Sequence, residues 1–94
     1  MKLEYHDERA DTLYIRFNDA LYEYSNELDE FRFLDCDVNG NAIGVELLNV
    51  SNGVTLDNLP HQAEIDKILT KRNIKVYACA NGYCHCKETG KIWG

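Results

Sequence analysis

Two segments of alternating apolar and polar residues, joined by an Asn-Gly pair, form the clearest structural pattern in the chain. The segments are FRFLDCD, residues 31–37, and AIGVELLNV, residues 42–50. Alternation of apolar and polar side chains is typical of a strand with one buried face. Asn39 and Gly40 tolerate the positive φ angles of a type I′ turn, so the two segments are predicted to pair as an antiparallel hairpin.

The register of this hairpin follows from the position of its turn. A two-residue turn places Leu34 opposite Val45 and Cys36 opposite Ile43. Cys36 is therefore predicted to be a small core residue.

Three earlier segments also have strand character. In TLYIRF the side chains of Leu13, Ile15 and Phe17 share one face of a strand. The acidic stretch NELDE is predicted to be a bend before the hairpin. The predicted strands are residues 2–6, 12–17 and 21–25, and the bend is residues 26–30.

One helix is predicted, over about residues 61–72. Ile65, Ile68 and Leu69 have the i, i+3, i+4 spacing of a buried helical stripe. Asn73 can adopt the left-handed conformation that ends a helix.

The predicted fold class is α+β, because strands outnumber helices and are not interleaved with them. It consists of an antiparallel β-meander of about five strands, with the helix packed on a face and a C-terminal β-hairpin around Asn81-Gly82. The 94 residues suit a single domain, 1–94. Its parts are the sheet core 2–52, the connector and helix 53–74, and the hairpin and tail 75–94.

Charge is distributed unevenly along the chain. Residues 1–50 carry twelve Asp or Glu against four Lys or Arg, a net charge of −8, and residues 51–94 carry four against six, a net charge of +2. An acidic surface repels phosphate backbones, so we expect no nucleic-acid binding, whereas a basic protein partner would be attracted. No apolar run is long enough to span a membrane, and four cysteines without a secretion signal favour a cytoplasmic protein.

Residues 2–52 resemble a bacterial and archaeal family known as domain of unknown function 2283. The resemblance lies in ADTLYIRF and in the hairpin DCDVNGNAIGVE, which matches the acidic family pattern D-x-D-x-[DN]-G-x-x-x-G-x-E. Phe31, where a glycine is common, and Cys36, where an aromatic residue is common, depart from the pattern. The resemblance implies a small β-rich fold without established activity or catalytic residues. Because some members are encoded beside small toxin-like proteins, it also implies an antitoxin-like or partner-binding role.

The same hairpin matches the spacing of an EF-hand calcium loop. Asp35, Asp37, Asn39 and Glu46 would be the calcium ligands. Calcium requires six to eight oxygen ligands supplied by a loop that wraps around the ion, whereas both flanks here alternate as strands. The hairpin interpretation explains Asn39 and Gly40 without an ion.

The C-terminal stretch CANGYCHC is the clearest candidate for metal chemistry. In a hairpin around Asn81-Gly82, Cys79, Cys84 and Cys86 share one face and could hold zinc, while His85 points away. A fourth ligand would come from elsewhere, and the candidates are His6, His61, Cys36 or a second chain. The alternatives are inert thiols or a strained Cys79–Cys84 disulfide.

The sequence contains no catalytic motif that we can identify, so we expect a non-enzymatic protein that binds another protein or a second copy of itself. Tyr83 and Trp93 are candidate interface anchors, because aromatic residues dominate binding hot spots. Trp93 could equally complete the core. The alternative function is a zinc-binding module that uses the C-terminal cysteines; no other cofactor is expected.

Overall fold

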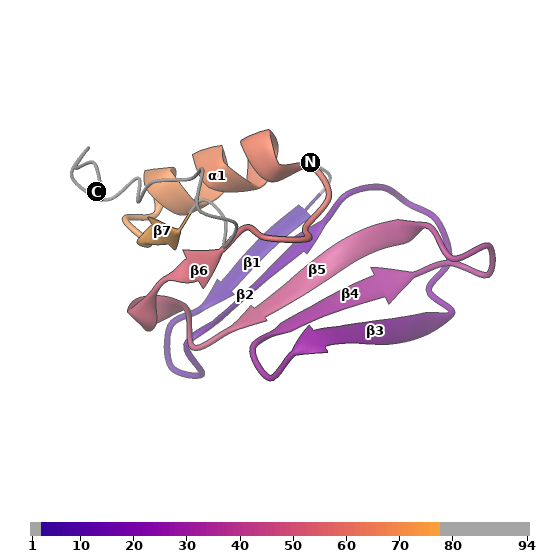
Figure 1. Ribbon diagram of the computed structural model, residues 1–94, viewed down its shortest axis with the longest axis horizontal. Helices are drawn as coiled ribbons and strands as arrows, with labels where there is room; N and C mark the ends of the chain where they lie inside the picture. Colours follow the sequence, from indigo (N-terminus) through magenta and orange to yellow (C-terminus); the bar gives the residue numbers. More distant parts are fainter. Residues whose placement is uncertain (1–2, 78–94) are drawn as a thin grey trace. The chain divides into compact units, whose positions relative to one another are not determined.

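The computed structural model describes residues 3–77 (Figure 1). The chain divides into two compact units, Met1–Asn49 and Val50–Gly94. In the described residues, the first unit holds a five-stranded antiparallel sheet, and the second holds a helix and a two-stranded parallel sheet. The α+β fold class is therefore confirmed. The helix packing on a face of the large sheet, and the single-domain organisation, stay predictions.

The strand order of the large sheet corrects the predicted meander at one point. The order is β1-β2-β5-β4-β3, so β5 rather than β3 lies beside β2. Because the most apolar strand gains most from neighbours on both sides, β5 takes the centre and the exposed, acidic β3 takes an edge. The strands are β1 Leu3–Asp7, β2 Thr12–Arg16, β3 Tyr24–Asp29, β4 Arg32–Cys36 and β5 Ala42–Leu48.

The prediction for β3 was wrong by several residues. Residues 26–29, predicted as a bend, belong to the strand, while residues 21–23 precede it. The reason is a tighter reversal than the composition suggested. The Asp29 carboxylate accepts a hydrogen bond from the Phe31 amide at 2.9 Å, and a β-bulge between Glu27 and Asp29 accommodates the extra residue.

One face of the large sheet is apolar and buried. The side chains of Leu13, Ile15, Ile43, Val45 and Leu47 are fully buried. We call this the apolar face, and the opposite face, which carries Tyr14, Arg16, Asp35 and Glu46, the polar face. The period-2 alternation of β2 and β5 thus places every second side chain on the buried face of the sheet.

The predicted register of the β4–β5 hairpin is half right. Leu34 pairs with Val45 as predicted, but Cys36 pairs with Ala42 and not with Ile43, because the register shifts between Asp35 and Cys36. Cys36 is nevertheless a buried core residue, as predicted.

The turn of this hairpin is not the predicted type I′ turn. Gly40 has a positive φ of 85°, whereas Asn39 is not among the described residues with positive φ. The Gly40 amide donates to the Asp37 carbonyl at 3.0 Å, and the Asp37 amide donates to the Asn41 carbonyl at 2.9 Å. This is a three-residue loop in which a left-handed glycine follows a turn, and the additional residue accounts for the register shift.

The described part of the second unit contains a β-α-β arrangement that follows a short helix. A 3-10 helix, Val50–Asn52, leads into β6 Val54–Thr55, helix α1 Gln62–Lys71 and β7 Val76–Tyr77, with β7 parallel to β6. The predicted helix over 61–72 is confirmed to within one residue at each end. The predicted C-terminal hairpin around Asn81-Gly82 lies outside the described residues.

Helix α1 ends as its sequence predicts. Asn73 is left-handed, with φ of 62°. The Ile74 amide donates to the Leu69 carbonyl at 2.9 Å and the Asn73 amide to the Thr70 carbonyl at 3.0 Å, which together form a Schellman motif. Ile65, Ile68 and Leu69 are buried, as their spacing predicted. Within residues 3–77, no helix has the length and hydrophobicity needed to cross a membrane.

Candidate functional site

The strongest candidates from the sequence lie outside the described residues. These are the zinc ligands Cys79, Cys84 and Cys86 and the interface anchors Tyr83 and Trp93. Of the candidates for a fourth zinc ligand, Cys36 is a free, buried thiol in β4, His6 is half-buried in β1, and His61 is exposed at the start of α1. In the described part of the chain, no three His, Cys, Asp or Glu side chains are grouped to hold a metal ion.

The predicted calcium ligands are distributed over a β-hairpin. Asp35 lies in β4 and Glu46 in β5, where it pairs with Phe33. The Asp37 carboxylate accepts hydrogen bonds from the amides of Asn39 and Asn41, both at 2.9 Å. These bonds from Asn41 and Asn39 hold the pKa of Asp37 below its ordinary value. Asp37 therefore has a role in the turn that needs no ion.

A chain of hydrogen bonds crosses the polar face and centres on Asp35. Its carboxylate accepts from the Tyr14 hydroxyl at 2.8 Å and from the Ser25 hydroxyl at 2.9 Å. The Tyr22 hydroxyl lies 3.1 Å from Ser25 Oγ and completes the chain. The four residues come from β2, β4, β3 and the segment before β3, so we call them the Asp35 cluster.

Gly44 makes the hydrogen bond between Tyr14 and Asp35 feasible. It pairs with Arg16 on β2 and with Asp35 on β4, and therefore lies between Tyr14 and its acceptor. A Cβ atom at this position would lie 2.7 Å from the Tyr14 hydroxyl oxygen. The Tyr14 side chain can reach Asp35 because residue 44 has no side chain.

The protonation of Tyr14 reflects this environment. Partial burial raises the pKa of Tyr14, the hydrogen bond from Arg16 lowers it, and the Asp35 carboxylate raises it, with a net increase. Tyr14 therefore remains a neutral hydrogen-bond donor at physiological pH. The Asp35 cluster has hydroxyl donors around one carboxylate and contains no histidine or other general base for its hydroxyls apart from that carboxylate, so its geometry is that of a structural tie between three strands.

The segment around β3 has the most unusual surface in the first unit. Four of the eight exposed large hydrophobic side chains in the described residues lie in it: Leu21 at 87%, Tyr22 at 54%, Tyr24 at 45% and Phe31 at 42% exposure. Residues 17–31 also contain five Asp or Glu and no Lys or Arg. We call residues 21–31 the β3 edge segment, because β3 has a strand neighbour on one side only among the described strands.

The sequence alone does not single out the β3 edge segment. Its composition predicts that the acidic stretch, residues 26–30, is a bend, and a bend has no strand edge. The alternation of Tyr24, Asn26 and Leu28 with Ser25 and Glu27 was the available signal. It is weak because both sets contain polar residues.

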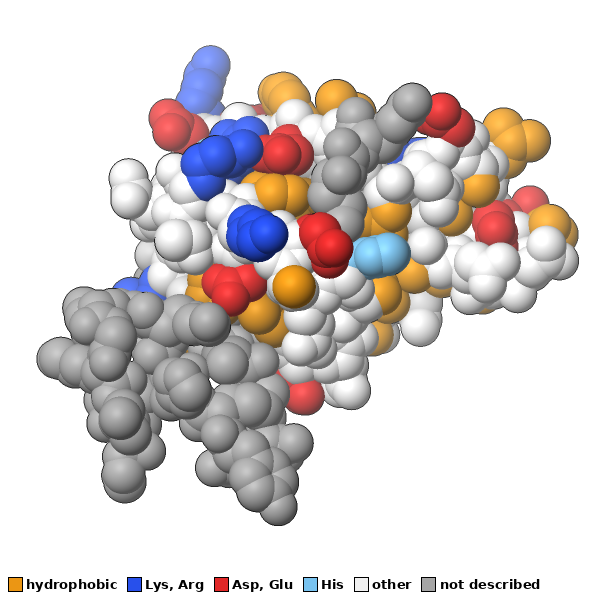
Figure 2. Space-filling model, turned by 90° about the horizontal axis from the view of Figure 1, so that it is seen from above, with side chains coloured by type: hydrophobic (Ala, Val, Ile, Leu, Met, Phe, Trp, Pro, Cys, Tyr) orange, Lys and Arg blue, Asp and Glu red, His pale blue; other side chains and the backbone are white. Residues whose placement is uncertain are grey.

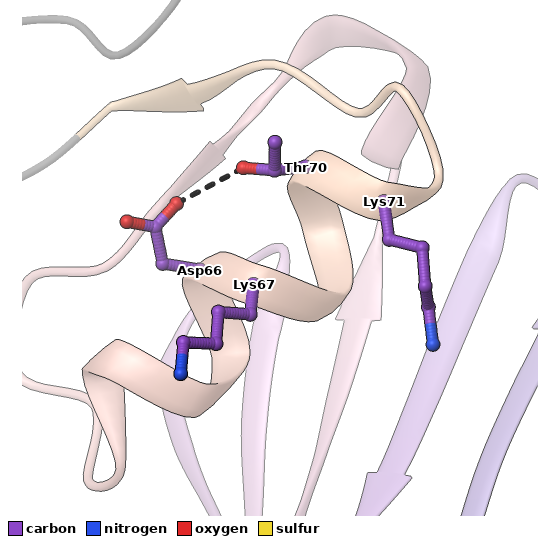
Figure 3. Close-up of a pocket in the computed structure, with 4 residues that line it drawn as sticks. All are labelled: Asp66, Lys67, Thr70 and Lys71. Atoms are coloured by element: carbon purple, nitrogen blue, oxygen red, sulfur yellow. Dashed lines mark hydrogen bonds between the residues drawn. The ribbon is translucent and has the colours of Figure 1, made fainter.

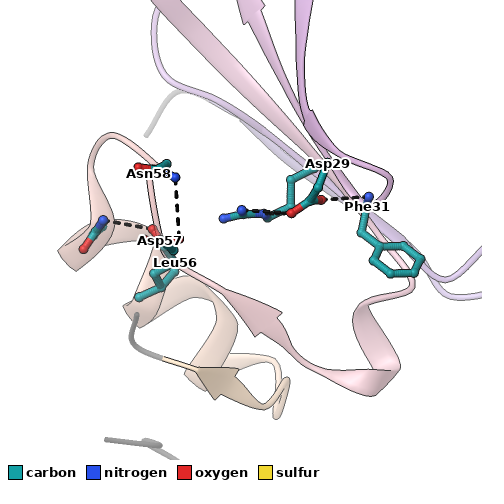
Figure 4. Close-up of polar contacts among 7 residues, drawn as sticks. Asp29, Phe31, Leu56, Asp57 and Asn58 are labelled. Carbon is teal, nitrogen blue, oxygen red and sulfur yellow. Dashed lines mark hydrogen bonds and ion pairs between the residues drawn. The ribbon is translucent and has the colours of Figure 1, made fainter. Parts of the chain in front are cut away.

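The turn that ends β3 is held by an ion pair. The Arg32 guanidinium contacts the Asp29 carboxylate through Nε and one terminal nitrogen, each at 2.9 Å (Figure 4). Burial raises the pKa of Asp29, but the hydrogen bonds from Arg32 and from the Phe31 amide outweigh it and hold this pKa below its ordinary value. Figure 4 also shows the loop after β6, where the Gln62 side chain donates to the Leu56 carbonyl at 2.9 Å.

The lowered pKa values of Asp29 and Asp37 predict a loss of stability in acid. A carboxylate whose pKa is lower in the folded state stabilises the protein above its unfolded pKa of about 3.9, and this contribution disappears as pH falls through the folded value. We expect the free energy of unfolding in urea to fall below about pH 4. The double variant Asp29→Asn, Asp37→Asn should have a flatter dependence. Equal slopes for wild type and double variant would contradict the assignment.

A shallow depression on α1 is the remaining candidate. It is lined by Asp66, Lys67, Thr70 and Lys71, and Thr70 donates to Asp66 at 3.2 Å (Figure 3). All four residues come from successive turns of one helix, and three of them are exposed. This is an open helix surface without the convergent, enclosed groups of a ligand site.

Comparison with known proteins gave one match. A family model described as a protein of unknown function, DUF2283, matches residues 2–51. No curated protein and no solved structure matches the chain. The matched residues contain the whole large sheet, including the Asp35 cluster and the β3 edge segment.

Proposed function

Since the chain belongs to the DUF2283 family of proteins of unknown function, we propose its role from its own residues: a non-enzymatic, cytoplasmic protein-binding module that acts through the β3 edge segment. The observation that supports this proposal is that four exposed hydrophobic side chains and four acidic residues lie together in residues 21–31, in and around an edge strand. Exposed large apolar side chains that are concentrated in one segment among polar residues are a feature of protein interaction sites.

The surface seen from above serves as a comparison. Figure 2 shows hydrophobic side chains interspersed with acidic and basic ones on the surface seen from above. Scattered apolar side chains of this kind are normal on a protein that binds nothing. The β3 edge segment differs because its charges have a single sign.

The sign of the charge favours a basic partner. The segment from residue 17 to 31 has a net charge of −5, since it contains five acids and no bases. Complementary charge accelerates association and suppresses unsuitable partners. A basic protein neutralised by an antitoxin-like module would meet this requirement, whereas a second copy bound through the same segment would place like charges together.

Site-specific photocrosslinking in cells tests the proposal. A photoreactive phenylalanine analogue replaces Tyr22, which is exposed, or Thr70 on α1 as a control position. We expect a discrete crosslinked protein from position 22 and not from position 70. The captured protein is then purified, and its binding to the untagged module is measured by native mass and calorimetry.

Two results would contradict the proposal. One is a monomeric native mass with no discrete crosslink at position 22. The other is a reconstituted complex whose affinity is unchanged when Leu21 and Tyr22 are both replaced by serine. A native mass of two chains, lost on truncation of residues 78–94, would instead support the homodimer.

The zinc alternative is an independent prediction. If Cys79, Cys84 and Cys86 bind zinc, elemental analysis should find about one zinc per chain, or one per two chains when the site is shared. Replacing Cys84 by serine should remove the metal, while Cys36→Ser should not if the fourth ligand lies elsewhere. Substoichiometric zinc together with three freely titratable tail thiols would end this alternative.

A further inference from the structure

The backbone of β3 has hydrogen-bonding groups that face an open edge. The carbonyl of Cys36 on β4 accepts from the Glu23 amide at 2.8 Å, and the carbonyl of Phe31 accepts from the Leu48 amide at 2.8 Å. In an antiparallel ladder, successive residues direct their N–H and C=O groups to opposite sides. The backbone N–H and C=O groups of the even-numbered β4 residues therefore point toward β3, and those of the odd-numbered residues point toward β5.

The same alternation assigns the groups of β3. Tyr24 and Asn26 pair with Cys36 and Leu34, so their backbone groups face β4. Ser25 and Glu27 direct theirs to the side on which the described residues place no strand. Two consecutive hydrogen-bonding positions for an added strand are thus available.

The side chains of β3 differ between the two faces of the sheet. Ser25 and Glu27 are on the polar face, because they pair with Asp35 and Phe33, while Tyr24 and Asn26 are on the apolar face. An added antiparallel strand would place one set of alternate residues beside the Glu27 carboxylate. Its other set would lie beside the Tyr24 ring, which is 45% exposed.

We propose that β3 binds an extended segment of a basic partner protein by strand addition, with basic residues alternating with apolar ones. Basic residues of the partner pair with Ser25 and Glu27 and lie near the carboxylate, and apolar residues cover Tyr24. Main-chain hydrogen bonds supply affinity in this mode, and alternate side chains supply specificity. This inference rests on the proposed function, since it names the partner chemistry at the same segment.

Like charges argue against a second copy as the occupant. Two β3 strands paired across a two-fold axis would bring acidic residues of both chains into opposition, because this stretch carries no Lys or Arg. Like charges directly opposite each other destabilise a sheet. A basic partner would instead be attracted to the acidic residues of β3, and salt would weaken this attraction.

The probe for the test is an acetylated seven-residue peptide in which valine and lysine alternate, Val-Lys-Val-Lys-Val-Lys-Val. A peptide of the same composition with all lysines at one end is the matched control. We expect the alternating peptide to bind about tenfold more tightly than the control, and the variant Glu27→Lys to bind it about tenfold more weakly than wild type.

Backbone methylation distinguishes strand addition from simple charge attraction. Lysines that pair with Ser25 and Glu27 direct their amides at β3, so N-methylation of the lysines should weaken binding at least about tenfold. N-methylation of the valines, whose amides point away, should leave the affinity within about threefold. The protein itself is unchanged in this comparison, so a folding defect cannot account for the result.

Amide exchange locates the bound peptide. The amides of Ser25 and Glu27 should gain protection on binding, while those of Tyr24 and Asn26 should change little because they already face β4. Equal effects of the two methylation patterns, or protection elsewhere, would overturn strand addition and leave the proposed function intact. Absence of peptide binding would by itself overturn strand addition, and together with absence of a crosslinked partner at Tyr22 it would overturn both.

Discussion

Replacing Ile15 by alanine is expected to lower the free energy of unfolding by about 2–5 kcal/mol, the range for a large aliphatic side chain removed from a packed core. Ile15 is fully buried and pairs with Val45 on the central strand. Its removal therefore costs the transfer energy of the lost methyl and methylene groups, and also leaves a cavity. Urea unfolding followed by circular dichroism measures the change.

The matched control is a leucine on the neighbouring edge strand. Leu3 is 55% exposed and pairs with Arg16, so it belongs to the polar side of the same two strands. Leu3→Ala should change the unfolding free energy by no more than about 0.5 kcal/mol. A loss for Ile15→Ala as small as that for Leu3→Ala would show that the apolar face of the sheet is not a packed core.

The sequence predicts the parts of this fold that depend on local periodicity. Alternation in β2 and β5 identifies the apolar face, and i, i+3, i+4 spacing identifies the buried stripe of α1. Asn73 ends the helix because its left-handed conformation is a property of that residue and its neighbours alone. In each case the information lies within a few consecutive residues.

Features that depend on a specific side-chain bond are not predictable in this way. The Asp37 carboxylate binds the amides of Asn39 and Asn41 and thereby selects a three-residue loop over the type I′ turn that Asn-Gly favours. Asp29 similarly tightens the next reversal and extends β3 into the acidic stretch. Periodicity does not report which carboxylate will bond to which amide.

The placement of β5 between β2 and β4 is a non-local property. Periodicity reports which side chains are buried, but it does not report which strand lies beside which. The candidate site could not be predicted for the same reason, because an edge strand can be identified only when the strand order is known. The acidic and aromatic residues of β3 are visible in the sequence, but only the order β1-β2-β5-β4-β3 places them on a sheet edge.

The family pattern has a physical basis in the same geometry. Tyr14 belongs to the first matching segment, while Asp35 and Gly44 belong to the second. The structure joins them, because the Tyr14 hydroxyl donates to Asp35 at 2.8 Å across a position without a side chain. These residues of the pattern thus have a role in holding the strands of the sheet together.

Replacing Gly44 by alanine should therefore cost about 1–3 kcal/mol of unfolding free energy, as expected when a methyl group is forced into a packed contact. Elsewhere in a strand, Gly→Ala is normally stabilising by about 0.5–1 kcal/mol, so the sign itself is informative. The new Cβ would lie 2.7 Å from the Tyr14 hydroxyl oxygen and 3.1 Å from the Ile15 carbonyl oxygen. Of these two neighbours, only the hydroxyl can be removed by substitution.

A double-mutant cycle with Tyr14→Leu separates the two contacts. Leucine has no hydroxyl group, so Gly44→Ala should become neutral or stabilising in that background, giving a coupling energy of at least about 1 kcal/mol. The Ile15 carbonyl is present in both backgrounds, and its effect cancels in the cycle. If Gly44→Ala costs the same with Tyr14 and with leucine, the β2 backbone rather than the tyrosine requires glycine at position 44, and the link between the two segments of the family pattern is not energetic.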